Sequence, residues 1–146
     1  LELIAEYSVG LPLDFETGAL IANPFNGASF AFVEDPADAN NQVGQITNVG
    51  VDFEGVTLQL GTNLDLSTDK TITMQFNTSV ANVPVLFKLE GGEAAELTAT
   101  AATTGWQELT FDFSAASGTF NGITIFVDGG GFTTGTFYID DIEQNP

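Results

Sequence analysis

Short stretches in which apolar and polar residues alternate are the feature that most constrains how this chain can fold. In residues 71–80, Ile72, Met74 and Phe76 fall on one face, and polar residues fall between them. The same alternation recurs in residues 56–61, 84–91, 106–114 and 122–129. A period of two residues is that of a β-strand with one buried face, and such strands are typical of antiparallel sheets.

Turn-forming sequences separate these stretches and indicate the fold class. NPFNG, EDPADANNQ, STDK and DGGG are rich in residues that favour turns. Further strands are expected at residues 12–15, 28–34, 45–49 and 136–143. Many short strands, with turns at a spacing of about 8–12 residues, predict an all-β fold, a two-sheet antiparallel β-sandwich of the jelly-roll type.

The length of the chain is that of one domain. Its 146 residues are enough to bury a full hydrophobic core. We expect residues 11–146 to form a single module, with residues 1–10 as a linker or an added edge segment. No run of apolar residues is long enough to span a bilayer, so we expect no membrane insertion.

The charge balance excludes several classes of partner. Twenty acidic residues against two lysines, with no Arg and no His, give a net charge of −18. Proteins that bind nucleic acids neutralise phosphates with Lys and Arg, and binding to anionic glycans or anionic membranes needs the same residues. A neutral partner or a cation fits this chain, and nucleic acid does not.

The residue inventory also argues against catalysis. Because His and Cys are absent, only carboxylates or the two lysines could activate a Ser or Thr nucleophile. Outward acids such as Glu90, Asp112 and Asp128 could supply a carboxylate pair for glycoside hydrolysis. A glycosidase also needs a long cleft with several aromatic platforms, and the chain has one Trp and two Tyr. We therefore expect a module that is not an enzyme.

Acidic residues stand at both ends of the predicted sheet. Asp14 and Glu16 flank one aromatic residue in LPLDFETG, and Asp140 and Asp141 are adjacent in FYIDDIEQNP. The first and last strands of a jelly roll commonly lie close together, so we expect these carboxylates to approach one another. Alternation places Tyr138 and Asp140 on one side of the last strand and Asp141 on the other.

Clustered carboxylates repel one another unless a cation neutralises them. Ca²⁺ is the natural candidate because it takes about six to eight hard oxygen ligands. The loop EDPADANN supplies Glu34, Asp35, Asp38 and Asn40 as a third wall for such a site. The alternative is that these acids are solvated surface charge on a very acidic protein, and spacing alone favours neither interpretation.

Six segments in a fixed order carry a resemblance to a known family. They are LPLDFETG, FNGASFAFVEDPADANNQVGQITN, KTITMQF, PVLFKLEG, GWQELTFDFS and FYIDDIE. The set covers residues 11–143 and resembles the calcium-containing jelly-roll carbohydrate-binding modules attached to laminarinases and to surface glycan-binding proteins of polysaccharide-degrading bacteria. The resemblance implies a structural calcium site formed by Glu16, with Asp14 nearby, and by Asp140 rather than Asp141. Asp35 of the loop completes the predicted metal-binding set.

Glycan binding needs flat apolar faces for stacking and planar polar groups for the sugar hydroxyls. In residues 122–129, alternation predicts that Thr124, Phe126 and Asp128 are exposed. The outward candidates for ligand binding are Gln59, Gln75, Lys88, Glu90, Phe126 and Asp128. For Lys88, the alternative is a simple cross-strand ion pair with Glu90 or Asp128, which would contribute little to stability.

Two further aromatic residues are candidates for stacking on sugar. Trp106, the only Trp, opens a strand after a Gly-containing turn. It would either present a platform or cap the core at the edge of the sandwich, and the second role is the commoner one in jelly rolls. Phe53 lies in GVDFEGV, where the resemblance places a Trp on a loop of related modules. A Phe there offers a smaller platform.

The resemblance implies a function as well as a fold. We expect an extracellular or bacterial cell-surface module, monomeric by itself and part of a multidomain chain. Its partner would be a neutral polysaccharide, with β-1,3-glucan (laminarin) as the first candidate. The alternative is a calcium-stabilised structural or adhesion spacer that binds no sugar, which the scarcity of Trp and Tyr favours.

Overall fold

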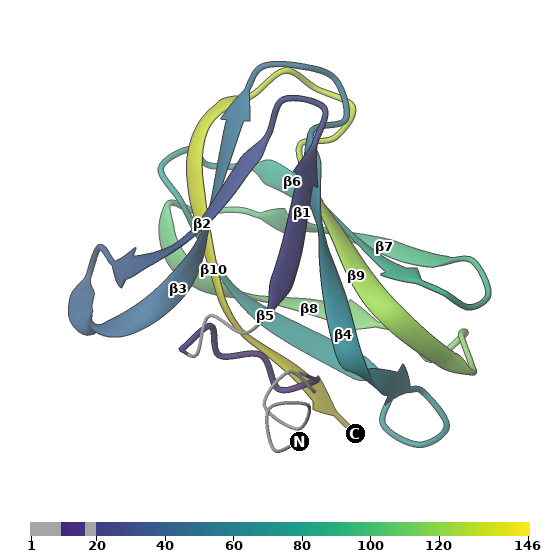
Figure 1. Ribbon diagram of the computed structural model, residues 1–146. Coiled ribbons are helices and arrows are strands. Elements are labelled where there is room, and N and C mark those ends of the chain that lie inside the picture. The colour runs from purple at the N-terminus through teal and green to yellow at the C-terminus, as the bar shows by residue number, and fades with distance from the viewer. Residues whose placement is uncertain (1–9, 17–19) are drawn as a thin grey trace.

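The protein is a sandwich of two five-stranded sheets. The computed structural model describes residues 10–16 and 20–146, and its regular elements over these residues are all strands (Figure 1). Of these residues, none belongs to a helix long and apolar enough to cross a membrane. The first sheet contains β1 (Ile21–Phe25), β4 (Gly55–Asp65), β6 (Val83–Glu90), β7 (Ala95–Ala101) and β9 (Thr119–Val127). The second sheet contains β2 (Ser29–Asp35), β3 (Asp38–Val49), β5 (Thr71–Thr78), β8 (Gly105–Asp112) and β10 (Thr134–Asn145).

The strand order shows how the chain builds the two sheets. The first sheet has the order β1-β4-β9-β6-β7, and the second has the order β2-β3-β10-β5-β8. The strand pairings are antiparallel throughout, and the chain crosses repeatedly from one sheet to the other. The predicted all-β fold, a two-sheet antiparallel jelly roll, is confirmed.

The core is filled by the apolar residues that alternation places inside. In β5, Ile72, Met74 and Phe76 are fully buried, and the residues between them are half-exposed. Phe87 of β6 stacks on Phe111 of β8, with ring centroids 4.6 Å apart, so aromatic contacts join the two sheets. Such a pair adds about 0.5–1.5 kcal/mol to the burial of its two rings.

The first described segment lies against the last strand of the chain. Leu13 forms an isolated antiparallel bridge with Ile142, with N–H···O distances of 2.9 and 3.0 Å in the two directions. The strand expected at residues 12–15 is reduced to this bridge, because Pro12 has no N–H to donate and Phe15 adopts a left-handed backbone with φ 60°. The expected proximity of the two ends is confirmed, whereas residues 1–9 of the expected linker lie outside the described residues.

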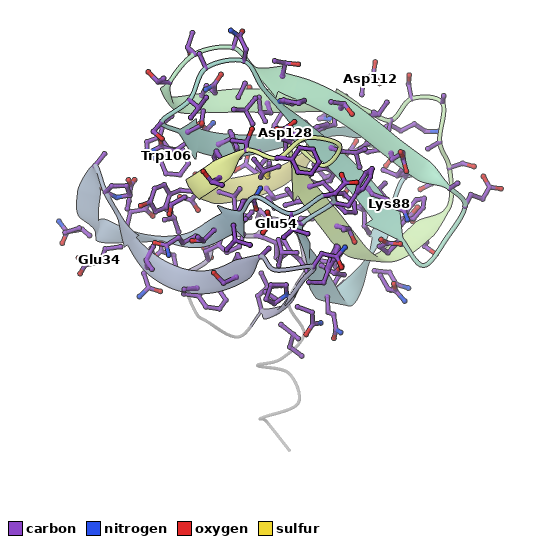
Figure 2. All side chains as sticks on the ribbon, turned by 90° about the horizontal axis from the view of Figure 1, so that it is seen from above. Glu34, Glu54, Lys88, Trp106, Asp112 and Asp128 are labelled. Carbon is purple, nitrogen blue, oxygen red and sulfur yellow. The ribbon has the colours of Figure 1, made fainter. Side chains whose placement is uncertain are left out.

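A buried carboxylate holds the loop between β3 and β4, which links the two sheets. Glu54, labelled in Figure 2, is 2% exposed. It accepts the backbone N–H groups of Val49, Gly50 and Val51, each at 2.8 Å. Hydrogen bonds to a carboxylate are about twice as strong as those between neutral groups. This side chain therefore fixes the path of the chain from the second sheet into the first.

Candidate functional site

A row of polar and aromatic side chains crosses the outer face of the second sheet. The register pairs Tyr138 of β10 with Gln45 of β3 and with Asn77 of β5. Asn77 in turn pairs with Trp106 of β8. These residues alternate with core residues such as Phe76, so their side chains point away from the core. The row places two aromatic rings and two side-chain amides on one face.

A second row lies one pleat further along the same face. Asp140 of β10 pairs with Gln75 of β5, and Gln75 pairs with Glu108 of β8. The Gln75 amide lies 3.5 Å from the Glu108 carboxylate. Asp140 is only 4% exposed although its side chain points away from the core. Another part of the chain must therefore cover it.

The tip of the β2–β3 hairpin, residues 34–42, provides that cover. β2 and β8 are the two edges of the sheet, which would lie about 19 Å apart if the sheet were flat, at about 4.8 Å per strand. Nevertheless, Trp106 Nε1 of β8 donates to Asp35 Oδ1 of β2 at 3.0 Å. Asn41 Nδ2 donates to Asp140 Oδ2 at 2.9 Å. The hairpin tip therefore curls over β10 and β5 and reaches the opposite edge of the sheet.

An open pocket of about 240 Å³ lies at the hairpin tip. Its walls come from the hairpin, from β5, β8 and β10, and they are Asp35, Asn41, Gln75, Trp106, Asp140 and Asp141. The lining combines one indole ring with amide and carboxylate groups. Such a lining offers one apolar surface for stacking and several groups that can form hydrogen bonds with a small polar ligand.

Carboxylates from the two ends of the chain lie beside this pocket. Glu16 Oε2 accepts the N–H of Gln42 at 3.1 Å, which ties the first segment to the hairpin tip. Asp14 Oδ1 accepts the N–H of Glu16 at 3.1 Å. Asp141 has a left-handed backbone with φ 46°, at a point where the pairing of β10 with β5 shifts register. This irregularity turns Asp141 away from the core, so that both adjacent aspartates of β10 line the pocket rather than opposite faces of the strand.

Burial and repulsion disfavour the charged forms of these two aspartates. Burial raises the pKa of Asp140 from the usual 3.8 to about 6. The hydrogen bond from Asn41 opposes this rise, and the charges of Asp141 and Glu16 add to it. Burial also raises the pKa of Asp141, and carboxylates from both ends of the chain add to that effect. The acids that stand far apart in the sequence therefore interact in the folded protein.

The donor chemistry of this region suits a hard cation. Carboxylate, amide and backbone oxygens are the ligands that Ca²⁺ takes, and a cation would relieve the repulsion between the acids. Of the predicted metal ligands, Asp35 and Asp140 line the pocket, and Asp14 and Glu16 lie close enough to Asp141 to influence its charge. Within residues 10–16 and 20–146, however, no three acidic side chains are grouped closely enough to hold a metal ion. A bound cation would have to draw these side chains together.

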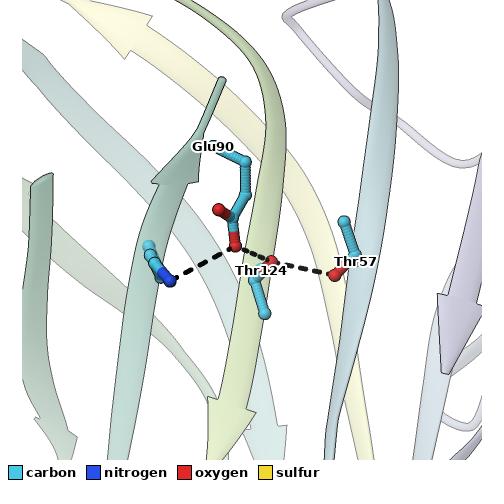
Figure 3. A network of polar contacts seen from close by, with 4 residues as sticks. Thr57, Glu90 and Thr124 are labelled. Atoms are coloured by element: carbon cyan, nitrogen blue, oxygen red, sulfur yellow. Dashed lines mark hydrogen bonds and ion pairs between the residues drawn. The ribbon is translucent and has the colours of Figure 1, made fainter. Parts of the chain in front are cut away.

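Four of the predicted ligand-binding residues lie on the outer face of the first sheet, and they are Gln59, Lys88, Glu90 and Phe126. Lys88 Nζ lies 3.8 Å from Glu90 Oε2. Thr124 Oγ1 donates to the same carboxylate oxygen at 2.6 Å and lies 2.9 Å from Thr57 Oγ1 (Figure 3). An ion pair is therefore present, but Lys88 and Glu90 both belong to β6, so it is not the cross-strand pair considered for Lys88. The links between strands in this network are made by the two hydroxyl groups.

Two expectations about exposure on this face are wrong. Thr124 was expected to be exposed but is 2% exposed, because it points outward into the contacts with Glu90 and Thr57. Phe126 is half-buried rather than exposed. The rings of Phe25 and Phe53 lie 5.6 and 6.1 Å from its centroid, both edge-on, so Phe126 presents no free platform.

Phe53 and Asp128 lie in loops that meet at one end of the sandwich. Phe53 is 50% exposed, and its N–H donates to the Gly129 carbonyl at 2.7 Å. The carboxylate of Asp128 accepts the hydroxyl of Thr133, and its carbonyl accepts the N–H of Gly131 at 2.9 Å. Asp128 is therefore engaged in its own turn, whereas the ring of Phe53 is accessible.

The predicted ligand-binding residues thus divide into three groups, of which the first-sheet group and the end-loop group meet where Phe53 contacts Phe126. Gln75 and Trp106 share the outer face of the second sheet, four residues lie on the other sheet, and two lie in the end loops. Figure 2 shows Trp106 and Lys88 well apart. The core-capping role considered for Trp106 is wrong, because its side chain is on the outer face and bonds to Asp35.

Three residues of the outer face were not among the predicted ligand-binding residues, namely Gln45, Asn77 and Tyr138. Alternation does assign their side chains to the polar face of their strands, so one necessary signal is present in the sequence. The missing information is which strands are neighbours, since it is the order β3-β10-β5-β8 that aligns these residues with Trp106.

No protein-family model and no curated protein sequence matches this chain. Solved structures do match it. One is a family 11 carbohydrate-binding module from Clostridium thermocellum in complex with a β-1,3-1,4-mixed-linked tetrasaccharide. The TM-score is 0.59 with 13% sequence identity, over 86% of this chain and 87% of that one. Another is TmCBM61 in complex with β-1,4-galactotriose, with a TM-score of 0.56 and 13% identity, over 94% of this chain and 96% of that one.

A longer protein contains a similar unit. An arabinose-bound α-L-arabinofuranosidase matches 96% of this chain with a TM-score of 0.65 and 18% identity, but the match spans only 25% of the enzyme. At such identities the likeness establishes the fold alone. The chain thus has the jelly-roll fold of carbohydrate-binding modules.

Proposed function

We propose that this chain is a non-catalytic module that binds a neutral polysaccharide on the outer face of its second sheet. The observation that carries the proposal is the row formed by Gln45, Tyr138, Asn77 and Trp106, with Gln75 in the next row. Aromatic rings stack on the apolar faces of sugar rings, and carboxamides both donate to and accept from hydroxyls. One face offers both kinds of group.

Charge supports a neutral ligand. With 20 acids and two lysines, the chain would repel an anionic glycan. Our first candidate is a β-1,3-glucan of the laminarin type. The similar modules named above were solved with a mixed-linked tetrasaccharide and with a galactotriose, so mixed-linkage β-glucan and galactan are further candidates.

The acids beside the face support binding rather than hydrolysis. Asp35 accepts the indole N–H of Trp106, and Asp140 accepts the amide of Asn41. Both carboxylates are thus used in holding the hairpin tip. The two similar modules that match this chain over most of their length are themselves carbohydrate-binding modules, which agrees with a role without catalysis.

We further propose that Ca²⁺ is a structural cofactor, with Glu16 and Asp140 as ligands and with Asp14 and Asp35 nearby. Burial, with an added contribution from the neighbouring acids, raises the pKa of Asp140 to about 6, and the ion would neutralise these acids. It would also connect the first segment to the last strand and so stabilise chain ends that otherwise fray.

The proposed setting is extracellular or on a bacterial cell surface, in a longer multidomain protein. A tethered module of this kind raises the local concentration of its glycan for its neighbours, even when its own affinity is modest. One observation favours the alternative of a calcium-stabilised spacer. The indole N–H of Trp106, which could bind a sugar hydroxyl, is already bonded to Asp35.

Titration calorimetry tests the proposal. Laminarin, mixed-linkage β-glucan, galactan and alginate are titrated, each with calcium and with EGTA. Heat with a neutral glycan but not with alginate supports the proposed function. No heat with any glycan, together with a calcium-dependent melting temperature, would establish the spacer instead.

A further inference from the structure

The hairpin tip makes the two sides of the proposed glycan face unequal. Tyr138 and Asn77, in the first row, are half-exposed. Asp140, one pleat away, is buried beneath the hairpin tip. The bond between Asp35 and Trp106 joins the two edges of the sheet at this point. A ligand that follows the face from the first row therefore meets a barrier at the hairpin tip.

The pocket at this barrier is small and polar. Its volume of about 240 Å³ is below the range of about 300–1,000 Å³ that holds a drug-sized ligand. It therefore suits one sugar unit rather than a stretch of chain. Trp106 supplies an apolar wall, and Gln75 and Asn41 supply amide groups that donate and accept hydrogen bonds.

We propose that this pocket takes the terminal sugar unit of a polysaccharide, and that Asp35 sets this specificity by holding the hairpin tip against Trp106. The inference rests on the proposed function and specifies how the same face is used. The next sugar units of the polysaccharide lie over Asn77 and Tyr138. An internal sugar unit is excluded from the pocket, because the polysaccharide would have to continue through the contact between Asp35 and Trp106.

The chemistry of a chain end agrees with this placement. A terminal unit carries a free hydroxyl where an internal unit carries a glycosidic bond to the next sugar. A pocket lined by amides and carboxylates satisfies that extra hydroxyl. An internal unit lacks that hydroxyl and would therefore make fewer hydrogen bonds in the pocket.

The hairpin offers a matched control for Asp35. Asp35 and Asp38 each accept a backbone N–H two residues on, from Ala37 at 2.8 Å and from Asn40 at 3.0 Å. The bond to Trp106 is made by Asp35. Asp38→Ala therefore removes a local turn contact and keeps the barrier, whereas Asp35→Ala removes both. Asp35→Asn keeps an oxygen acceptor for the indole and should therefore retain more of the barrier than Asp35→Ala.

The test is calorimetric titration with two laminarin-type β-1,3-glucan fractions of different chain length at equal mass, in constant calcium. Mixed-linkage β-glucan fractions are used in parallel. For the wild type and Asp38→Ala, we expect the number of sites per mass to rise in proportion to the number of chain ends, and Asp35→Asn should lie closer to the wild type than Asp35→Ala does. For Asp35→Ala, we expect more sites on the long chains, because internal units gain access.

The outcomes separate this inference from the proposed function. Binding by the wild type with the same number of sites per mass on short and long chains would overturn the end-binding inference and leave the function standing. Equal behaviour of Asp35→Ala and Asp38→Ala would overturn the role of Asp35. No binding to any glycan would overturn the proposed function, and this inference with it.

Discussion

The carboxylate of Glu54 holds the β3–β4 loop, and its removal should measurably destabilise the protein. Glu54 is 2% exposed and accepts three backbone N–H groups at 2.8 Å each. A hydrogen bond to a charged group contributes about 1.5–3 kcal/mol, so three fully additive bonds would give about 4.5–9 kcal/mol. Val49 and Val51 are exposed, so water can reach this loop and recover part of that energy. We expect Glu54→Ala to lower the free energy of unfolding by about 3 kcal/mol.

Equilibrium unfolding in urea measures this loss. The fluorescence of Trp106, the only Trp, reports the transition. A lower midpoint with an unchanged slope means that the native state has lost stability rather than that the unfolded state has changed. For a chain of this size, a loss of about 3 kcal/mol also corresponds to a fall of roughly 6–12 °C in melting temperature.

A short series of variants tests the physical cause. Asp52→Ala removes an exposed acid in the same loop and should change stability by less than about 0.5 kcal/mol. Glu54→Gln keeps one oxygen but turns an amide donor toward a backbone N–H, so its loss should be intermediate, about 1–2 kcal/mol. The reasoning is refuted if Glu54→Ala costs less than about 1 kcal/mol, or no more than Asp52→Ala.

The remaining predictions concern the glycan face, the acidic chain ends and the first sheet. Trp106→Ala or Tyr138→Ala should weaken glycan binding by at least about tenfold, or about 1.4 kcal/mol, whereas Lys88→Ala should change it by less than about twofold in calorimetry. In EGTA, stability measured by urea unfolding should fall by up to about 3 kcal/mol as the pH rises from about 4 to 7. The folded state raises the pKa of Asp140 from 3.8 to about 6 and so binds this proton more strongly than the unfolded state. Asp140→Asn should remove most of that dependence, and a dependence that survives this change would contradict the assignment. Thr124→Val should cost about 1 kcal/mol in urea unfolding, because it deprives Glu90 of a hydrogen bond, and an unchanged midpoint would show that water replaces the hydroxyl.

The faces of the strands could be predicted because alternation is a local property. A side chain at every second position of a strand lies on one side of the sheet, whatever the neighbouring strand is. Thr124 shows that alternation predicts the direction of a side chain but not its burial. Its outward direction follows from the sequence, but its burial depends on Glu90 and Thr57, which come from two other strands.

The candidate site depended on contacts between distant residues and was predicted only in part. The approach of the chain ends followed from the expected fold and from the position of the acids. The bond between Asp35 and Trp106 joins residues 71 positions apart, on opposite edges of one sheet. It requires a hairpin that curls over the face, and no local pattern in EDPADANNQ specifies that curvature. For the same reason, Tyr138 and Asn77 could be assigned to a polar face but not to a common site.

The acidic chain ends and the proposed glycan face are joined by two consecutive residues of the hairpin tip. Asn41 donates to Asp140 at 2.9 Å, and the N–H of Gln42 donates to Glu16 at 3.1 Å. A cation that draws Asp140 and Glu16 together would therefore also position the hairpin tip, and with it the contact with Trp106. Removing calcium should then shift the fluorescence emission of Trp106 in the folded protein, well below the melting temperature. If calcium stabilises only the chain ends, its removal will lower the melting temperature and leave the emission of the folded state unchanged. That result would refute this coupling.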